Sequence, residues 1–264
     1  MLLRNGLVLG GVAAAGGMAG GALAYWRRED LFDAWRSVRG AAAAPDGRRL
    51  QFQRDAARIR AAQAQQTRET VKRLKAKYET AVFGKVRVWD LVEKLGMCID
   101  PSDDSLMLTS QYVHVQQILE AMERDRVEDR DLILITLLHD LGKVMLLTSE
   151  VPEHIAGYTA PIGEFPRGAG LDNVVFQFGH DEMLYSRLKG HVPDHIAWAV
   201  RYHSSTFGAM EPYMNERDRT YYERCLSKFQ PYDQGSKSHT RLPRVDMAKY
   251  RALIEEMFPQ PILL

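Results

Sequence analysis

The chain has 264 residues, of which 45% are hydrophobic and 26% charged, a composition typical of a soluble globular protein with one large domain or two small ones. Its 35 Lys and Arg nearly balance 34 Asp and Glu, so the net charge of +1 gives no reason to expect a nucleic-acid partner. Cys98 and Cys225 are the only cysteines, which excludes a zinc ribbon or a disulfide framework and favours a reducing, cytoplasmic compartment.

The first segment of the chain, residues 1–28, is hydrophobic. Residues 5–26 carry no charge, are rich in Gly and Ala, and are flanked by arginines on both sides. Their length is enough for a helix to span a bilayer. Three interpretations stay open, namely a membrane anchor that leaves the catalytic part in the cytoplasm, a cleaved targeting peptide, and a flexible tail. Residues 29–50, rich in Ala and Arg, are interpreted as a linker, and residues 51–264 as the functional domain.

The domain shows helical periodicity throughout, with no convincing strand pattern and no internal repeat. An irregular stretch at 148–170 is long enough to form a lid or a substrate wall, and residues 231–237 are predicted to form a loop. Helices are expected over 51–80, 86–97, 110–123, 131–147, 172–188 (capped by Asp172 or Asn173), from Pro193 onward, 214–230 and 245–258.

The stretch 131–147 (DLILITLLHDLGKVMLL) carries the clearest chemical signal. Apolar residues recur at three- and four-residue spacing, which predicts a helix buried on most sides. This helix carries His139 and Asp140, a polar pair that is costly to bury without partners. Either a metal ion or an ordinary ion pair satisfies them. Lys143 follows His139 by four residues and is expected on the same face.

Further metal-capable side chains come from four other segments of the chain. They are His114, His180, His203 and Asp233. Together with the first pair they provide four imidazoles and two carboxylates, enough for two metal ions that share a bridging carboxylate. Nitrogen and oxygen ligands without thiolate suit iron, manganese or zinc. The polar turn Asp100–Asp104 either caps the backbone or binds substrate hydroxyls.

The order H…HD…H…H…D is similar to that of the HD-domain superfamily, a helical metal-binding fold. The motifs LLHDLGKV, GLDNVVFQFGHDE, RYHS and YDQGSKS, preceded by DPSDD, narrow this further. As a set they resemble the myo-inositol oxygenase family, and the resemblance runs from about Gln66 to Pro261. It implies an all-α, HD-domain-like helical bundle around a di-iron site in the mixed-valent Fe(II)/Fe(III) state.

The resemblance also assigns roles to individual residues. One iron would be held by His114, His139, Asp140 and Asp233. The second would be held by Asp140, His180 and His203, so that Asp140 bridges the two. The substrate would be bound by Asp100, Ser102, Asp103, Lys143, Gly157, Ser204 and Lys237. The remaining histidines match no ligand of the family, and His195 is the reserve candidate because it shares a helix face with His203.

The implied activity is cleavage of a C–C bond of a cyclic polyol by O2, most simply myo-inositol to D-glucuronate. Asp140 and Lys143 would be catalytic, the latter by stabilising an alkoxide. Three alternatives stay open. One is a related di-iron oxygenase with another substrate. Another is an HD-type phosphohydrolase in which Lys143, Lys237 and Arg201 meet phosphate. The third is a membrane-tethered binding protein with a vestigial metal site.

Three features depart from the family pattern. The substrate loop reads Gly157-Tyr158-Thr159, where the family has Gly-Asp-Thr, and Ser205-Thr206-Phe207 stands where the family has an aromatic-Pro step. The family's N-terminal arginine arm has no clear counterpart. Tyr158 therefore either stacks on a substrate ring or fills space left by a smaller substrate, and the substrate stays open at this point.

Overall fold

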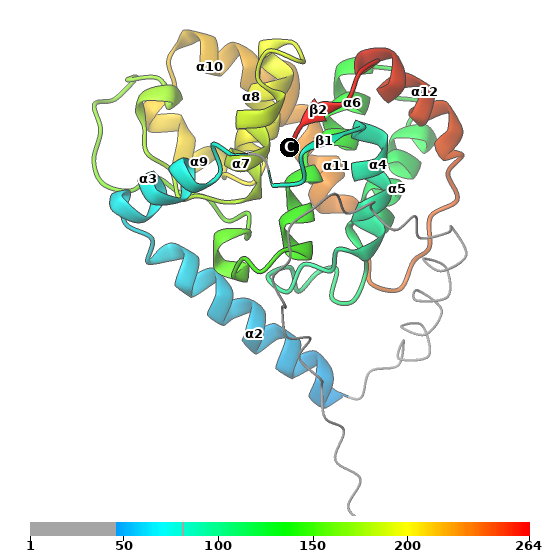
Figure 1. Ribbon diagram of the computed structural model, residues 1–264, viewed down its shortest axis with the longest axis horizontal. Helices are drawn as coiled ribbons and strands as arrows, with labels where there is room; N and C mark the ends of the chain where they lie inside the picture. The colour runs from blue at the N-terminus through cyan, green and yellow to red at the C-terminus, as the bar shows by residue number, and fades with distance from the viewer. Residues whose placement is uncertain (1–45, 81) are drawn as a thin grey trace, which may run out of the picture.

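The computed structural model describes residues 46–80 and 82–264, and Figure 1 shows their arrangement. The hydrophobic segment 1–28 and residues 29–45 of the predicted linker lie outside the described residues. In the described part, no helix combines the length and the apolar composition that a membrane span requires. The fold is all-α, as predicted, apart from one pair of two-residue strands.

The elements follow one another in a simple order along the chain. The α-helices are α2 (Asp46–Ala64), α3 (Arg68–Lys77), α4 (Val88–Lys94), α5 (Gln111–Arg124), α6 (Arg130–Leu138), α7 (His180–Leu188), α8 (Asp194–Tyr202), α9 (Phe207–Met210), α10 (Glu216–Tyr221), α11 (Ser227–Ser236) and α12 (Met247–Met257). Short 3-10 turns are η1 (Leu95–Met97), η2 (Leu141–Leu147), η3 (Pro152–His154), η4 (Leu171–Asn173) and η5 (Glu211–Tyr213), and η6 (Tyr222–Leu226) is a π-helical turn.

The helices form two groups. In Figure 1, α7, α8, α9 and α10 gather on one side and α4, α5, α6 and α12 on the other, while α2 runs along the lower edge. Contacts of α6 with α8, and of η2 with both α4 and α7, join the two groups. The strands β1 (Lys85–Val86) and β2 (Ile262–Leu263) pair antiparallel, with Lys85 opposite Leu263. Two-residue strands are too short to show the alternation by which a strand is predicted.

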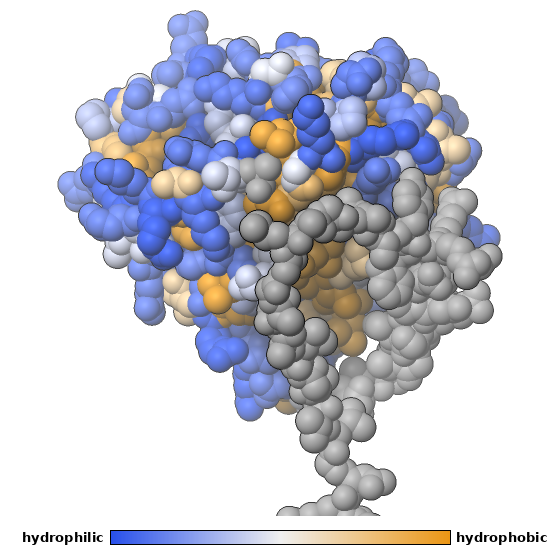
Figure 2. Space-filling model, in the orientation of Figure 1, coloured by the Kyte–Doolittle hydropathy of each residue, from blue (hydrophilic) through white to orange (hydrophobic). Residues whose placement is uncertain are grey.

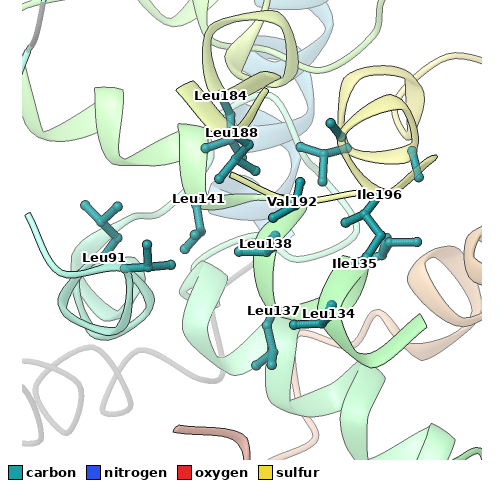
Figure 3. Packing of buried hydrophobic residues seen from close by; sticks show 14 of the residues in the cluster. Leu91, Leu134, Ile135, Leu137, Leu138, Leu141, Leu184, Leu188, Val192 and Ile196 are labelled. Atoms are coloured by element: carbon teal, nitrogen blue, oxygen red, sulfur yellow. The ribbon is translucent and has the colours of Figure 1, made fainter. Parts of the chain in front are cut away.

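Helix α6 forms the centre of the hydrophobic core. Its side chains are apolar on almost every face, so it is stable only when other elements surround it. Figure 3 shows Leu134, Ile135, Leu137 and Leu138 of α6 in one cluster with Leu184, Leu188 and Ile196 of α7 and α8, while Leu141 of η2 lies between α6 and Leu91 of α4. All are fully buried or nearly so. Each buried leucine contributes about 1.5–3 kcal/mol of transfer free energy, so this packing fixes where the residues that follow α6 lie.

The surface has the opposite character. On the face drawn in Figure 2, hydrophilic residues cover most of the described surface, and hydrophobic residues interrupt them in smaller areas. Large hydrophobic side chains with more than a third of their area exposed include Leu50, Val151, Tyr158, Phe207 and Leu263. Single exposed apolar side chains are normal on a folded protein, and only Tyr158 among these five lines a cavity.

The helix predicted over 131–147 is wrong in its second half. The α-helix ends at Leu138, and the chain continues after Asp140 as the 3-10 turn η2. Gly142 explains the tight course of η2. A Cβ atom at this position would lie 2.1 Å from the carbonyl oxygen of His180. The two backbones therefore touch where η2 passes the start of α7, and only glycine permits that approach.

The helix predicted over 172–188, with its cap at Asp172 or Asn173, is also wrong. Residues 174–179 are extended, and α7 begins at His180 after the backbone cap of Gly179. Phe176 forms an isolated antiparallel bridge with Pro161. A Cβ at Gly179 would lie 2.4 Å from the carbonyl oxygen of Ala156. Backbone pairing with the irregular loop thus replaces the helix that the side-chain pattern indicates.

Two other boundaries differ from expectation. The predicted helix over 51–80 consists of two helices, α2 and α3, and α2 begins at Asp46, inside the range predicted as linker. Thr67 separates them by capping α3 through its hydroxyl, which accepts from Thr70 N. The predicted loop 231–237 is helical up to Ser236, with Pro231 inside α11. The preceding π-helical turn already interrupts regular backbone pairing, and proline removes one further donor there.

The contact of Gly142 with α7 yields a stability prediction. Gly142→Ala is expected to lower the free energy of unfolding by about 1–3 kcal/mol, because the new methyl group forces two packed backbones apart. Gly96→Ala is the matched control, since no atom lies within 4 Å of the added Cβ at that position. Urea denaturation of both variants checks this, and equal stability of the two would contradict the close approach.

The loop that follows η2 is anchored through Glu150, which predicts a dependence of stability on pH. Glu150 accepts from Lys77 Nζ and from the Tyr78 hydroxyl, and it lies 2.8 Å from His154 Nδ1. Burial opposes ionisation, but these partners lower the pKa of Glu150 from 4.5 to about 2. The stabilisation is therefore complete above about pH 5 and is lost as the pH falls toward 2.

Glu150→Gln is expected to lower the free energy of unfolding by about 1–2 kcal/mol at pH 7, with part of the Coulomb energy lost to solvent screening. The difference from the unmodified chain should shrink between pH 5 and pH 2. Urea denaturation at several pH values measures it, and a difference that stays constant with pH would contradict the ionic role of Glu150.

Candidate metal centre and substrate cavity

A polar cavity opens to solvent where η2, α7, α8 and α11 meet the turn after η1. It contains every residue predicted to bind substrate and five of the six predicted metal ligands. Its lining consists of Asp100, Ser102, Asp103, His139, Asp140, Lys143, Gly157, Tyr158, His180, His203, Ser204, Asp233, Gln234 and Lys237. His114 alone does not line it and lies behind Asp233. The predicted residues, distant in the sequence, are thus brought together in one place.

Two of the histidines are placed by the same local device. His139 follows the last residue of α6, and His203 follows the last residue of α8. The final carbonyls of a helix have no partner within it. The Nδ1 atoms of these histidines lie 2.9 Å from Thr136 O and 2.7 Å from Val200 O. A carbonyl only accepts, so each Nδ1 carries the hydrogen and each neutral ring keeps a lone pair on Nε2.

His180, the first residue of α7, shows the same arrangement with a carbonyl from the irregular loop. Its Nδ1 lies 2.8 Å from Ile155 O. The Nε2 atoms of His180 and His203 are 3.3 Å apart. In the neutral rings neither Nε2 has a hydrogen to donate, so two lone pairs face each other in a buried place. A cation between them removes this repulsion.

Asp140 lies at the centre of these rings. Its Oδ1 is 3.0 Å from His180 Nε2 and 3.5 Å from His203 Nε2. Its Oδ2 is 3.2 Å from His139 Nε2, a buried nitrogen that makes no hydrogen bond. The two carboxylate oxygens therefore face different histidines. Burial opposes ionisation, but His139 and then Lys143 hold the pKa of Asp140 well below its usual value, so the carboxylate is charged.

A second group adjoins the first and shares His139. His114 Nε2 lies 2.9 Å from Asp233 Oδ1, and both side chains are buried. The potential ligand atoms of His114, His139 and Asp233 all lie within 4.8 Å of one another, as do those of His139, Asp140 and His203. The Asp140 charge outweighs burial and raises the pKa of His139. An environment that favours a bound proton at this nitrogen equally favours a metal cation in its place.

The charges around the cavity do not balance. The two cations are Lys143, which lies 3.1 Å from both Asp100 and Asp140, and Lys237, which lies 2.9 Å from Asp103. Asp233 is a fourth buried carboxylate beside these three. Four carboxylates thus face two ammonium groups, and uncompensated buried charge is costly. Positive charge at the imidazole nitrogens restores the balance, so the residues present fit one or two metal cations.

Lys143 is held as an ammonium group. Burial alone lowers the pKa of a lysine, but Asp140 and Asp100 raise that of Lys143 above its ordinary value. Its Nζ also donates to Gln111 Oε1 at 3.0 Å. A lysine that stays protonated cannot act as a base, but it can donate hydrogen bonds to an oxygen and stabilise negative charge there. Lys143 was expected near His139 on one face of a helix. The 3-10 turn η2 instead places it against Asp140.

The polar turn after η1 contributes hydrogen-bonding groups to the cavity lining. Asp100 Oδ1 accepts from both the backbone nitrogen and the hydroxyl of Ser102, at 2.8 and 2.6 Å. The turn therefore caps its own backbone and lines the cavity as well. Gly157 closes the next wall. A Cβ there would lie 2.5 Å from Ser204 Oγ and 2.7 Å from His180 Cε1, so the loop packs directly on the ring of His180.

Polar residues of α2 and of the short joint after it hold this loop and the segments beside it, and the sequence prediction missed them. Gln63 donates to Ala156 O at 2.6 Å and accepts from Tyr158 N at 3.2 Å. Gln66 accepts from Phe178 N at 2.7 Å. Arg60 donates to Ser102 O at 2.8 Å. The helix was predicted to present a solvated face. The available signal was the run 61–67 (AAQAQQT), which carries no charge inside an otherwise charged helix pattern. Gln63 has no exposed area.

A buried chain of hydrogen bonds lies behind the loop. The hydroxyls of Thr159 and Ser205 are 2.7 Å apart, and Thr159 also donates to Asp181 Oδ2 at 3.4 Å. Burial raises the pKa of Asp181 to about 7. The chain connects the loop, the start of α7 and the residues after His203. It therefore fixes three cavity segments relative to one another.

Three further polar side chains, His195, Arg201 and His154, lie outside the cavity. His195 Nε2 is 2.8 Å from Asp131 Oδ2, so its face of α8 points to α6 and the expectation of a reserve ligand is wrong. Arg201, considered for phosphate, pairs with Glu182 at 2.6 Å and with Asp172 at 2.8 Å. His154 pairs with Glu150. These partners account for the three side chains without any ligand.

Comparison with known proteins agrees with this architecture. A family model described as myo-inositol oxygenase matches residues 53–163 and 149–264. Inositol oxygenase 2 of Arabidopsis thaliana is 31% identical over 74% of this chain and 73% of its own length. The inositol oxygenases of Danio rerio and Bos taurus are 27% and 25% identical over 74% of this chain, and over 83% and 81% of their own lengths. Together with the all-α fold, these matches establish that the chain is an oxygenase that belongs to the myo-inositol oxygenase family.

Proposed function

We propose that this chain is a di-iron oxygenase that uses O2 to cleave a C–C bond of a cyclic polyol, with myo-inositol as substrate and D-glucuronate as product. The reaction is a four-electron oxidation in which O2 is the oxidant. One oxygen atom enters the product and the other leaves as water. The family and the inositol oxygenases named above support the reaction class, and the geometry of the cavity supports the assignment of residues.

The observation that carries the proposal is the arrangement of the imidazoles around Asp140. Three rings present Nε2 lone pairs to one carboxylate, because each Nδ1 is engaged by a backbone carbonyl. Such fixed tautomers are typical of histidines that bind metals. Zinc, manganese and iron all accept these nitrogen and oxygen ligands. The reaction requires a metal that changes oxidation state, which excludes zinc, and the resemblance to the di-iron oxygenase family favours iron over manganese.

The two oxygens of Asp140 support its role as a bridge. Oδ1 faces His180 and His203, and Oδ2 faces His139. We assign one iron to His114, His139, Asp140 and Asp233, and the other to Asp140, His180 and His203. When bound, the irons supply one-electron chemistry with O2 and Lewis acidity toward a substrate hydroxyl.

The protein's own groups bind and orient the polyol. Lys143 lies beside Asp140 and stays protonated, so its Nζ stabilises the hydroxyl oxygen that loses its proton. The remaining hydroxyls are assigned to other groups of the cavity lining, namely Asp100, Ser102, Asp103, Gly157, Ser204 and Lys237. Carboxylates accept from hydroxyls, and the ammonium groups donate to them. Because each ammonium is already paired with a carboxylate, the wall suits a neutral polyhydroxylated ligand.

The same pairing weighs against a phosphohydrolase. Phosphate requires uncompensated cations near the metals, but Lys143 and Lys237 are neutralised by buried carboxylates and Arg201 is engaged elsewhere. A vestigial binding site is equally poorly supported, because five of the six potential ligands converge in two buried groups and His180 lies 3.0 Å from Asp140 of one of them.

Oxygen consumption tests the proposed reaction. The chain loaded with Fe(II) is expected to take up O2 when myo-inositol is added and to form uronate in equimolar amount. Protein loaded with Zn(II), which has no redox chemistry, is the control and should be inactive. O2 uptake with another polyol but not with myo-inositol would assign that polyol as the substrate. Phosphate release from nucleotides without O2 uptake would refute the oxygenase.

Metal content tests the bridge. Asp140→Ala is expected to lose iron from both positions, because it removes a ligand of each and leaves opposed imidazoles without a counter-charge. Asp194→Ala, which changes an exposed carboxylate at the start of α8, is the control and should retain full iron. Elemental analysis after gel filtration measures both variants. Full iron content in Asp140→Ala would contradict the bridging role, and loss of half would assign Asp140 to one metal.

A further inference from the structure

Tyr158 occupies the mouth of the cavity, where the family has a carboxylate. Its side chain lines the cavity although 49% of the residue's area is exposed. The backbone on both sides of the ring is fixed. Tyr158 N donates to Gln63 Oε1, and the next residue, Thr159, is bound through its hydroxyl to Ser205. The ring is therefore a positioned part of the wall and not the free end of a mobile loop.

Arg60 fixes the ring itself. Its guanidinium carbon lies 5.1 Å from the centroid of the Tyr158 ring, a distance at which cation–π attraction operates. The same guanidinium donates to Ser102 O at 2.8 Å and to Asp104 Oδ1 at 3.0 Å. Arg60 thus connects the aromatic ring to the polar turn across the mouth. Arg60 lies over the ring, and the ring also lines the cavity. A ligand in the cavity would therefore meet the side of the ring that is turned away from the cation.

An aromatic wall at the mouth of the cavity favours a ligand with a flat face of C–H bonds. The hydroxyls of a cyclic polyol project mainly from its edge, and its C–H bonds form a flat, weakly polar face. The polar groups deeper in the cavity match the hydroxyls, whereas Tyr158 matches the C–H face. An acyclic polyol has the same hydroxyls but no persistent flat face, so it gains little from an aromatic wall.

We propose that Tyr158, held in place by Arg60, is a specificity-determining residue that packs against the C–H face of a cyclic polyol and selects it over an acyclic one. The inference rests on the proposed function for the substrate class. It adds that this chain replaces a polar contact at the mouth by an aromatic contact. Ring selection then depends on Tyr158, while iron ligation and the chemical step do not.

Equilibrium binding without O2 tests this directly, because no turnover takes place. The iron-loaded full chain is titrated with myo-inositol and with sorbitol by calorimetry. Tyr158→Ala is expected to raise the Kd for myo-inositol about 3- to 12-fold, the range of an aromatic packing contact, and the Kd for sorbitol less than 2-fold. Tyr158→Phe keeps the ring and should bind myo-inositol within 2-fold of the unmodified chain. Arg60→Ala should give an intermediate loss.

Phe207→Ala is the matched control. Phe207 is 44% exposed, and its ring lies 4.8 Å from that of Tyr222, outside the cavity. Its removal should leave both affinities unchanged. Tyr158→Leu, with its smaller change of volume, serves if the alanine variant proves unstable in thermal denaturation, and it should show the same selective loss because it lacks a flat π face.

The possible outcomes separate the inference from the function on which it rests. An equal loss of affinity for both polyols in Tyr158→Ala overturns ring selection while leaving the oxygenase intact. Tighter binding of myo-inositol by that variant also overturns it, because the ring then only fills space. Failure of the unmodified chain to bind either polyol refutes the proposed substrate class and the inference with it.

Discussion

The site depends on one constraint, namely that an imidazole with Nδ1 engaged by a backbone carbonyl must present Nε2 elsewhere. His139 and His203 meet it because each follows a helix by one residue, where a carbonyl three residues back is free. The end of a helix is thus what sets the tautomer. Had α6 continued to Leu147, the carbonyl of Thr136 would have had a backbone partner and would have been a less accessible acceptor for the ring of His139.

This constraint explains why the helices break where they do. The apolar core fixes α6, α7 and α8 beside one another, and the close approach of Gly142 to His180 brings the ends of α6 and α7 together. The ligands occupy the short non-helical joints that result. Lone pairs and carboxylates that lie close together repel one another. Core packing provides the free energy that offsets this repulsion, which a flexible loop could not provide.

The sequence predicted residues better than boundaries, and the reason is physical. His139, Asp140 and Asp233 were predicted as metal ligands from their side-chain chemistry, which depends only on the residue type. The C-terminal end of α6 and the start of α7 were not predicted, because they depend on backbone contacts between segments that periodicity does not show. The contacts of Arg60 and Gln63 were not predicted for a related reason. A polar residue on a charged helix is distinguished from its solvated neighbours only by the segment that packs against it.

The internal pairing of the ammonium groups also bears on how a substrate arrives. Lys143 and Lys237 each lie within 3.1 Å of a buried carboxylate, so little unpaired lysine charge projects from the mouth. A neutral polyol in any case experiences no long-range attraction, and its encounter with the cavity is governed by diffusion and by the width of the opening. Association should therefore be almost indifferent to ionic strength, and the enzyme would work alike in dilute and concentrated salt.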